Sequence, residues 1–206
     1  NWQDLTAYLD WTGFRPMTEF EFEKACRGTL APIPYEYPWG STTINNANNW
    51  ANGNTISEYC QNPNEGLCYY GNFGIIFRCG FAATTFTNRS QAGATYYGIM
   101  EMAGNMYEQC VGGGSSYDYS NFTTANGDGL VSPTGNANAT GWPVNGGNNS
   151  GTIIRGGCLY SSSRGNSDGI EVQVSDRRNI NGLNYSSYNA NSNKYTESGG
   201  RGVRSY

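Results

Sequence analysis

The segment of residues 97–110, YGIMEMAGNMYEQC, constrains the fold of this chain more than any other stretch. Apolar residues fill its two ends, and between them Gly104 and Asn105 form a pair that adopts positive φ at low cost. This pattern predicts two extended runs joined by a tight turn. Glu101 and Glu108 flank the turn, and calcium sites combine such carboxylates with backbone carbonyls. A bulged hairpin with two solvated acids explains the same pattern, so both interpretations stay open.

The composition indicates a loop-rich protein with a neutral, polar surface. Of the 206 residues only 14% are charged and 37% are hydrophobic, and there are 29 Gly and 16 Tyr. A chain of this length can bury a core of its own. The net charge of -4 gives no basis for nucleic-acid binding, which needs clustered Lys and Arg. No apolar run has the length of a membrane span.

Two helices are predicted near the beginning of the chain. Trp2, Leu5 and Leu9 recur at helical spacing, which predicts a short helix ending near Gly13. Thr18-Glu19-Phe20-Glu21 has the pattern of a capping box, so a second helix is expected over residues 19–27, with Gly28 as its stop. Both phenylalanines of this second helix, Phe20 and Phe22, are expected in the core.

The second half of the chain predicts strands between long loops. Residues 152–155 read as a strand, and residues 170–175 alternate with the period of two that is typical of a half-buried strand. The Asn- and Gly-rich stretches 41–64 and 112–150 cannot bury enough apolar area to form units of their own, so we expect loops there.

The six cysteines favour disulfides over a metal site. No CxxC pair is present and the chain contains no His, so a zinc site is not expected. Cys60 and Cys68 bracket a short Asn/Gly loop, which makes them the first predicted bridge. Disulfides indicate an oxidising compartment, whereas six free thiols in a cytosolic protein are the alternative.

Four ordered segments resemble motifs of one known family. They look like the signatures of the formylglycine-generating-enzyme (sulfatase-modifying factor) family, whose fold is a variant of the C-type lectin fold. The matching segments are residues 97–110, the helical stretch 8–28 (YLDWTGFRPMTEFEFEKACRG), residues 37–40 (YPWG), and residues 153–158 (IIRGGC) together with 200–204 (GRGVR).

The resemblance implies an α+β, C-type-lectin-like fold that is rich in loops. It would have two short helices near the N-terminus and a twisted, mostly antiparallel sheet. Residues 1–206 would form a single domain that lacks its N-terminal part, because the family has a further strand region there. Cys110 and Cys158 lie on neighbouring strands of the resembled fold, so they are the second expected disulfide. Cys26 and Cys79 are the remaining pair.

The resemblance also implies a structural calcium ion. The side chains of Glu101 and Glu108, with the carbonyls of Gly104 and Met106, would form one cage. Asn48 falls where the family places another set of calcium ligands.

The same resemblance argues against the two oxygenase chemistries of the family. Formylglycine-generating enzymes bind copper with a cysteine pair, and the matching positions here are Ser161 and Asn166, which cannot replace thiolates. The related iron-dependent sulfoxide synthases need histidine ligands, and this chain has none. We therefore expect no copper, no iron and no enzyme activity. Cys158, where the family has Ser, is conceivable as a lone reactive thiol, and a carboxylate pair for glycoside hydrolysis stays open.

Residues 161–195 carry the most information about function. They are rich in Tyr, Ser, Asn and Gly, which recognition loops use for rigid contact area and adaptable hydrogen bonds. The segment resembles the variable proteins of diversity-generating retroelements, which display such residues on this lectin variant. An Asn-rich surface loop of a bacterial structural protein is the alternative. The predicted ligand contacts are Arg164, Asn166, Glu171, Gln173, Asn179, Asn181, Asn184, Tyr185, Tyr188, Asn189, Asn191, Asn193 and Tyr195.

We therefore expect a non-catalytic, extracellular or cell-surface module for binding, adhesion or scaffolding, similar to Bacteroidetes surface proteins. Its partner would be a protein or a glycan, with no role for nucleic acid and no membrane span. One alternative is a structural subunit of a surface filament, phage, motility or secretion assembly, with its Tyr/Asn surface buried between copies. Another is an enzyme whose site is completed by a partner chain.

Overall fold

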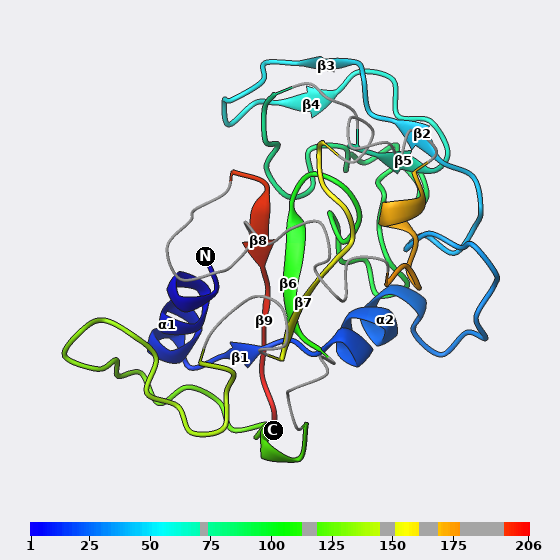
Figure 1. Cartoon of the computed structure of the whole chain (residues 1–206). Coiled ribbons are helices and arrows are strands. Elements are labelled where there is room, and N and C mark those ends of the chain that lie inside the picture. Colours follow the sequence, from blue (N-terminus) through cyan, green and yellow to red (C-terminus); the bar gives the residue numbers. More distant parts are fainter. Residues whose placement is uncertain (71–73, 113–118, 145–150, 161–168, 178–195) are drawn as a thin grey trace. The chain divides into compact units, whose positions relative to one another are not determined.

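The structure, a computed structural model, describes residues 1–70, 74–112, 119–144, 151–160, 169–177 and 196–206 (Figure 1). Contacts divide the chain into two compact units. The first unit comprises Asn1–Glu19, Glu108–Ile154 and Arg178–Tyr206, and the second comprises Phe20–Tyr107 and Arg155–Arg177. Both units are built from several separate stretches of sequence, so each depends on contacts between residues far apart in the chain.

The first unit begins with helix α1 (Trp2–Thr12). The Asn1 side chain accepts a hydrogen bond from the backbone N–H of Asp4, and the Asp4 side chain bonds back to the cap, which completes a capping box. Gly13 ends the helix in the left-handed conformation at φ 72°. The predicted helix is therefore confirmed, although its start depends on Asn1 rather than on apolar spacing.

Two sheets complete the first unit. Strand β1 (Arg15–Pro16) pairs antiparallel with β9 (Gly202–Val203). A three-stranded sheet has the order β7 (Thr152–Arg155), β6 (Tyr107–Val111) and β8 (Ser198–Gly200), with β6 in the centre (Figure 1). A 3-10 turn, η1 (Tyr119–Asn121), follows β6. The strand predicted at residues 152–155 is confirmed as β7.

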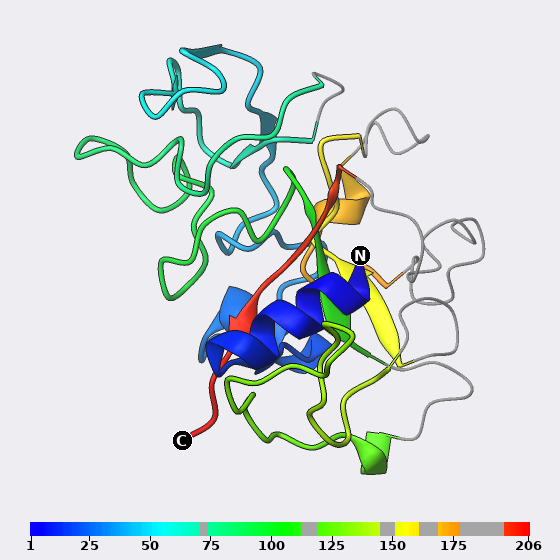
Figure 2. The ribbon, with the colours of Figure 1, turned by 90° about the vertical axis from the view of Figure 1, so that its left-hand side faces the viewer.

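Helix α1 lies against the C-terminal strands of the first unit (Figure 2). A Cβ atom on Gly200 would lie 2.3 Å from the Leu5 side chain, and one on Gly202 would lie 2.6 Å from the Leu9 side chain. Glycine at these two positions therefore lets the helix approach the strands. The buried Trp2 packs with Val111 beneath the helix.

The second unit contains helix α2 (Glu19–Arg27), which ends at Gly28 with φ 64° as predicted. Phe22 is fully buried, whereas Phe20 is 64% exposed, so the prediction that both rings lie in the core is wrong. Residues two apart on a helix point to different faces, and only one face of α2 is covered. None of the described helices has the length and hydropathy of a membrane span.

Short strand pairs and aromatic rings hold the loops of the second unit. Strand β2 (Asn45–Asn46) pairs parallel with β5 (Leu67–Cys68), and β3 (Trp50–Ala51) pairs antiparallel with β4 (Tyr59–Cys60). The Phe77 ring lies 4.3 Å from the Phe81 ring, 4.6 Å from the Tyr69 ring and 5.2 Å from the Trp50 ring, measured between centroids. This aromatic cluster supplies the core that the short strands alone could not provide.

The strand predicted over residues 170–175 is wrong. The structure instead has a 3-10 turn, η2 (Ile170–Val172), which follows Gly169 in the left-handed conformation at φ 71°. Glu171 and Val172 are both buried, and such consecutive burial does not match the alternating faces of a strand. The alternation of residue types at 170–175 therefore belongs to a tight turn that contains two adjacent buried residues.

The predicted Cys60–Cys68 disulfide is absent, because the structure records both residues as thiols. Cys60 ends β4, which pairs with β3, whereas Cys68 ends β5, which pairs with β2. The two sulfurs therefore belong to different strand pairs, and the intervening loop does not bring them together.

The other two expected disulfides are absent as well. The Cys110 thiol donates to the backbone carbonyl two residues earlier at 3.6 Å, and the Cys158 sulfur accepts from the backbone N–H two residues later at 3.4 Å. Cys26 is buried in α2, whereas Cys79 is exposed and donates to a backbone carbonyl at 3.5 Å. Local backbone groups thus engage the sulfurs of Cys79, Cys110 and Cys158 in place of a second cysteine.

Candidate functional site

Gly104 and Asn105 form a bend with the backbone conformation that the sequence predicts, but the extended run expected before it is wrong, because residues 97–103 form no strand. Gly104 has φ 73° and Asn105 has φ 61°. The Asn105 side chain accepts from the Phe77 N–H at 3.0 Å and donates to the Phe77 carbonyl at 2.8 Å. A Cβ atom on Gly104 would lie 2.3 Å from the Tyr69 carbonyl oxygen, so no other residue fits there without a shift of the backbone. The prediction of positive φ at both positions is confirmed.

Glu108, the second acid of the predicted calcium cage, has an arginine partner in the first unit. Its side chain is buried in β6 and accepts a hydrogen bond from Nε of Arg201 at 2.7 Å. Burial raises the pKa of Glu108 above its ordinary value, and the charge and hydrogen bond of Arg201 offset only part of that rise. The carboxylate is thus neutralised by a guanidinium from the C-terminal strand region.

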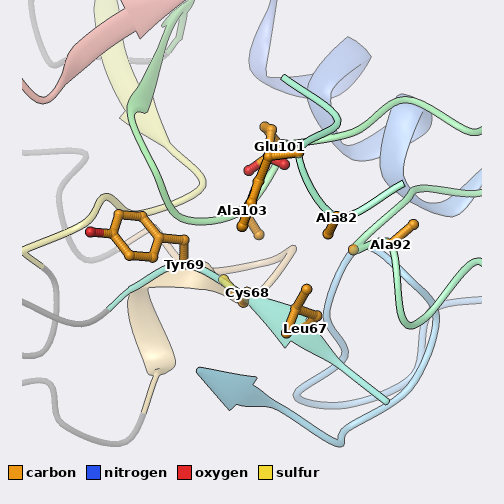
Figure 3. Close-up of a pocket in the computed structure, with 9 residues that line it drawn as sticks. Leu67, Cys68, Tyr69, Ala82, Ala92, Glu101 and Ala103 are labelled. Carbon is orange, nitrogen blue, oxygen red and sulfur yellow. The ribbon is translucent and has the colours of Figure 1, made fainter. Parts of the chain in front are cut away.

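Glu101, the first acid, lies in the second unit beside a small cavity (Figure 3). Its backbone has φ 58°, which is unusual for a residue other than glycine. The cavity also borders Cys68 and measures about 10 Å³, roughly the space needed by one water molecule. Burial, together with the charge of Glu101, raises the pKa of the Cys68 thiol well above its ordinary value. The thiol therefore stays protonated and is not a nucleophile.

A charged cluster in the second unit was not anticipated from the sequence. Glu23 in α2 forms ion pairs with Arg27, Arg155 and Arg177, and Arg27 also pairs with Glu36. The Arg155 side chain has no exposed surface, and its guanidinium lies 5.1 Å from the ring centroid of Phe22.

The Glu23 and Arg27 pair could have been found from its spacing of four residues on a helix. The Arg155 contact, which spans 132 residues, could not. The cluster fixes the segment that leads up to Arg177 against α2.

Asp10 is a buried acid that the sequence analysis missed. Its side chain is fully buried in α1. The carboxylate accepts hydrogen bonds from the backbone N–H groups of Asp128 at 3.2 Å, Asn138 at 2.8 Å and Ala139 at 3.3 Å. One side chain of the helix thereby holds two separate parts of the long loop that follows β6. The sequence offered no signal for this, since the partners are backbone groups far along the chain.

Comparison with known proteins was decisive for the family. The family model described as the sulfatase-modifying factor enzyme 1-like domain matches residues 1–183. The chain belongs to this family. Searches of curated proteins and of solved structures find no match. The α+β, loop-rich fold expected for the sulfatase-modifying factor family agrees with the two helices and the small, mostly antiparallel sheets described above.

The described residues do not fit the calcium cage that the sulfatase-modifying factor family implies. Glu108 already has the Arg201 guanidinium as its cation. Met106 is half-buried, and Asn48 lies on an exposed stretch of the second unit. In the part of the chain that the structure describes, no group of three or more His, Cys, Asp or Glu side chains is arranged to hold a metal. Of the four residues predicted for the cage, Glu101 and Gly104 have backbones with positive φ.

The copper positions of the family, Ser161 and Asn166, lie outside the described residues. Their chemistry is nevertheless fixed by residue type, because a hydroxyl and an amide do not bind copper as a thiolate pair does. Cys158 lies nearby in the sequence and is fully buried, with its sulfur bonded to the backbone. The Cys158 thiol is therefore not accessible to solvent.

Two of the predicted ligand contacts, Glu171 and Gln173, are described. Glu171 is only 5% exposed, and its carboxylate accepts from the Tyr107 hydroxyl at 3.0 Å, so its assignment to a displayed surface is wrong. Gln173 is half-buried and caps η2 through its backbone N–H. The other predicted contacts lie outside the described residues; they are Arg164, Asn166, Asn179, Asn181, Asn184, Tyr185, Tyr188, Asn189, Asn191, Asn193 and Tyr195.

Proposed function

We propose that this member of the sulfatase-modifying factor family is a non-catalytic, extracellular binding, adhesion or scaffold module. The observation that carries the proposal is the residue content of the chain. There is no His in 206 residues, and Ser161 and Asn166 stand where the family's oxygenases carry their copper-binding cysteines. The fold of the enzyme is thus kept while the groups that would perform its chemistry are replaced, and function lives in such groups rather than in the fold.

The buried state of Cys158 supports a role without catalysis. A thiol that attacks or binds a metal needs to be accessible and easily deprotonated. Cys158 has no exposed surface, and the buried Cys68 thiol has a strongly raised pKa. Cys79 is the one exposed cysteine, and all six cysteines are described. A single exposed thiol without His or a second cysteine does not make a catalytic pair.

The binding role rests on residues 161–195, where Tyr, Ser, Asn and Gly predominate. Tyrosine offers a rigid contact surface at low cost in conformational entropy, and Asn and Ser adapt their hydrogen bonds to a partner. A protein or a glycan fits this chemistry. The extracellular location rests on composition and on the recognition segment, since the expected disulfides are absent from the structure.

An assembly subunit is the second candidate, and a specific observation favours it. Phe20, Leu30, Ile33 and Tyr35 are all exposed large hydrophobic residues within one short stretch of the second unit. Exposed large apolar side chains concentrated in one segment offer a second chain apolar area to bury.

A binding experiment with a matched tyrosine control tests the proposal. The full chain and its Tyr185→Ala/Tyr188→Ala variant are applied to an array of immobilised glycans and to an array of extracellular protein domains. We expect selective binding by the wild type and at least about a tenfold loss in the variant. The Tyr35→Ala variant, which removes an exposed tyrosine outside the segment, should keep full binding.

Equal binding by all three chains would overturn the assignment of the surface to residues 161–195. Concentration-dependent self-association that the Tyr35→Ala variant weakens, with no selective binding to either array, would replace the proposal with the assembly subunit.

A further inference from the structure

A polar groove in the first unit is large enough for a small ligand. Its volume is about 340 Å³, at the lower end of the range for small-molecule sites. The loop residues 123–128 and 138–140 supply most of its lining, and Asp10 of α1 completes it. All of these residues belong to the first unit, and none has been assigned a role in ligand binding above.

Hydrogen bonds within the protein hold the walls of the groove in place. The Asp10 carboxylate holds both loop segments through three backbone N–H groups. The Thr123 hydroxyl donates to the Thr140 carbonyl at 2.6 Å and so links the two segments directly. The Trp142 indole donates to the Ala125 carbonyl at 3.2 Å. A ligand would therefore enter a fixed groove, and little order would have to be created on binding.

The side chains that line the groove indicate what it can bind. Asp128 and Asn138 offer a carboxylate and an amide, Thr140 offers a hydroxyl, and Ala125 and Ala139 offer methyl groups. Among the described residues that line the groove there is no Lys or Arg, so a phosphate, sulfate or carboxylate ligand would lack a partner for its charge. This described lining also has no large apolar side chain, which argues against a lipid or another apolar ligand.

Neutral hydroxyl-rich molecules match this lining. Their hydroxyl groups can donate to the Asp128 carboxylate and exchange hydrogen bonds with the Asn138 amide and the Thr140 hydroxyl. Their C–H faces can lie on the alanine methyl groups. Trp11, the residue after Asp10 in α1, has an exposed indole. Its backbone lies beside the same loop, because a Cβ atom on Gly129 would lie 3.9 Å from the Trp11 carbonyl oxygen.

We propose that this groove is a binding site for a neutral saccharide. The site goes beyond the proposed function, because it uses none of residues 161–195 and would exist whether or not those residues bind a partner. It gives the first unit a recognition role of its own.

An NMR titration of the full chain tests the proposal. The ¹⁵N-labelled protein is titrated with maltose, cellobiose, lactose and mannobiose at millimolar concentrations, and with sialyllactose as the anionic comparison. We expect at least one neutral disaccharide to shift the backbone signals of residues 123–128 and 138–140. Sialyllactose should bind more weakly than lactose, since the groove has an acid and no cation.

Matched variants locate the site. Asn138→Ala and Thr140→Val each remove a polar group from the groove and should weaken binding about tenfold. Thr124→Val changes an exposed threonine of the same loop that does not line the groove, so its affinity should equal that of the wild type. The dispersion of the spectra shows that each variant is folded.

Three results would overturn the proposal. They are no shift with any neutral disaccharide, equal affinity in the wild type and both groove variants, or loss of disaccharide binding only in the Tyr185→Ala/Tyr188→Ala variant. The last result would support the proposed recognition segment while removing the groove site, so the two ideas fail separately.

Discussion

Two glutamates that pair with arginine, the half-buried Glu23 of the second unit and the buried Glu108 of the first, have pKa values that move in opposite directions. Burial raises the pKa of Glu23, but hydrogen bonds and charges from Arg27, Arg155 and Arg177 outweigh it, and the pKa falls below its ordinary value. Burial also raises the pKa of Glu108, and its one partner, Arg201, does not compensate. The depth of burial and the number of guanidinium groups around each acid together decide which effect wins: Glu23 is half-buried among three arginines, whereas Glu108 is buried beside one.

This difference indicates two uses of a glutamate paired with arginine. Glu23 is stabilised as an anion and ties α2 to the segment ending at Arg177. Glu108 keeps a net cost of desolvation and stands where the family resemblance places a calcium ligand. An ion pair that only partly repays its desolvation is a poor stabiliser.

The largest effect is expected for Glu23→Gln. The change leaves the fully buried Arg155 charge without its carboxylate, and breaking one side of a buried ion pair costs about 4 kcal/mol. Urea unfolding of the variant and the wild type measures the difference in the free energy of unfolding. Lys24→Gln, which removes an exposed charge from the same helix, is the control and should be indistinguishable from the wild type. Equal stability of Glu23→Gln would show that the cluster is not a stabilising network.

Arg201→Gln should have the next largest effect. It leaves Glu108 buried without a cation, at a cost of about 3 kcal/mol at neutral pH. The loss should shrink in acid, because Glu108 can then be protonated. Unfolding midpoints at neutral and acidic pH measure this recovery. A loss that is the same at both pH values would contradict the raised pKa of Glu108.

Glu108→Gln should cost less than either, about 1 kcal/mol. The change removes the desolvation cost of the carboxylate, and the Arg201 side chain is partly exposed and stays hydrated. The Glu108→Gln/Arg201→Gln double variant completes a mutant cycle that isolates the pair. A loss as large as that of Glu23→Gln would show that the two acids are equivalent.

The smallest effect is the pH dependence of the two acids, which should have opposite signs. The folded pKa of Glu23 is lowered, so its contribution to stability is present above the ordinary value of 4.5 and is lost as the pH falls through the folded pKa. The folded pKa of Glu108 is raised, so its contribution is present below 4.5 and is lost as the pH rises through the folded pKa.

Stability curves of the wild type, Glu23→Gln and Glu108→Gln between pH 3 and 7 measure both slopes, the range being about that over which carboxylates titrate. Subtracting each variant from the wild type isolates one acid. Slopes of the same sign would refute the comparison.

Local sequence signals predicted local structure well. Gly13 and Gly28 mark the observed ends of both helices, and Gly104 with Asn105 forms the expected turn. Each of these features depends on backbone preferences of a few neighbouring residues. The family motifs predicted the fold because they occur in order along most of the chain, and the family model matches residues 1–183.

Long-range contacts explain what the sequence could not reveal. Arg201 lies 93 residues from Glu108, and Asp10 lies 128 residues from Asn138. No local spacing connects such pairs. Phe20 shows the same limit, because only the tertiary structure decides which face of α2 is covered. The alternating pattern that ends in η2 could not distinguish a strand from a turn in which neighbours are both buried.

The central claim is that this family member keeps the fold and lacks the oxygenase chemistry. Mass spectrometry of a cysteine-containing sulfatase peptide, incubated with the full chain, copper and oxygen, tests it most directly. An active formylglycine-generating enzyme treated in parallel shows that the assay works. We expect the peptide mass to stay unchanged with this chain. Repeated conversion of the cysteine to formylglycine would contradict the account.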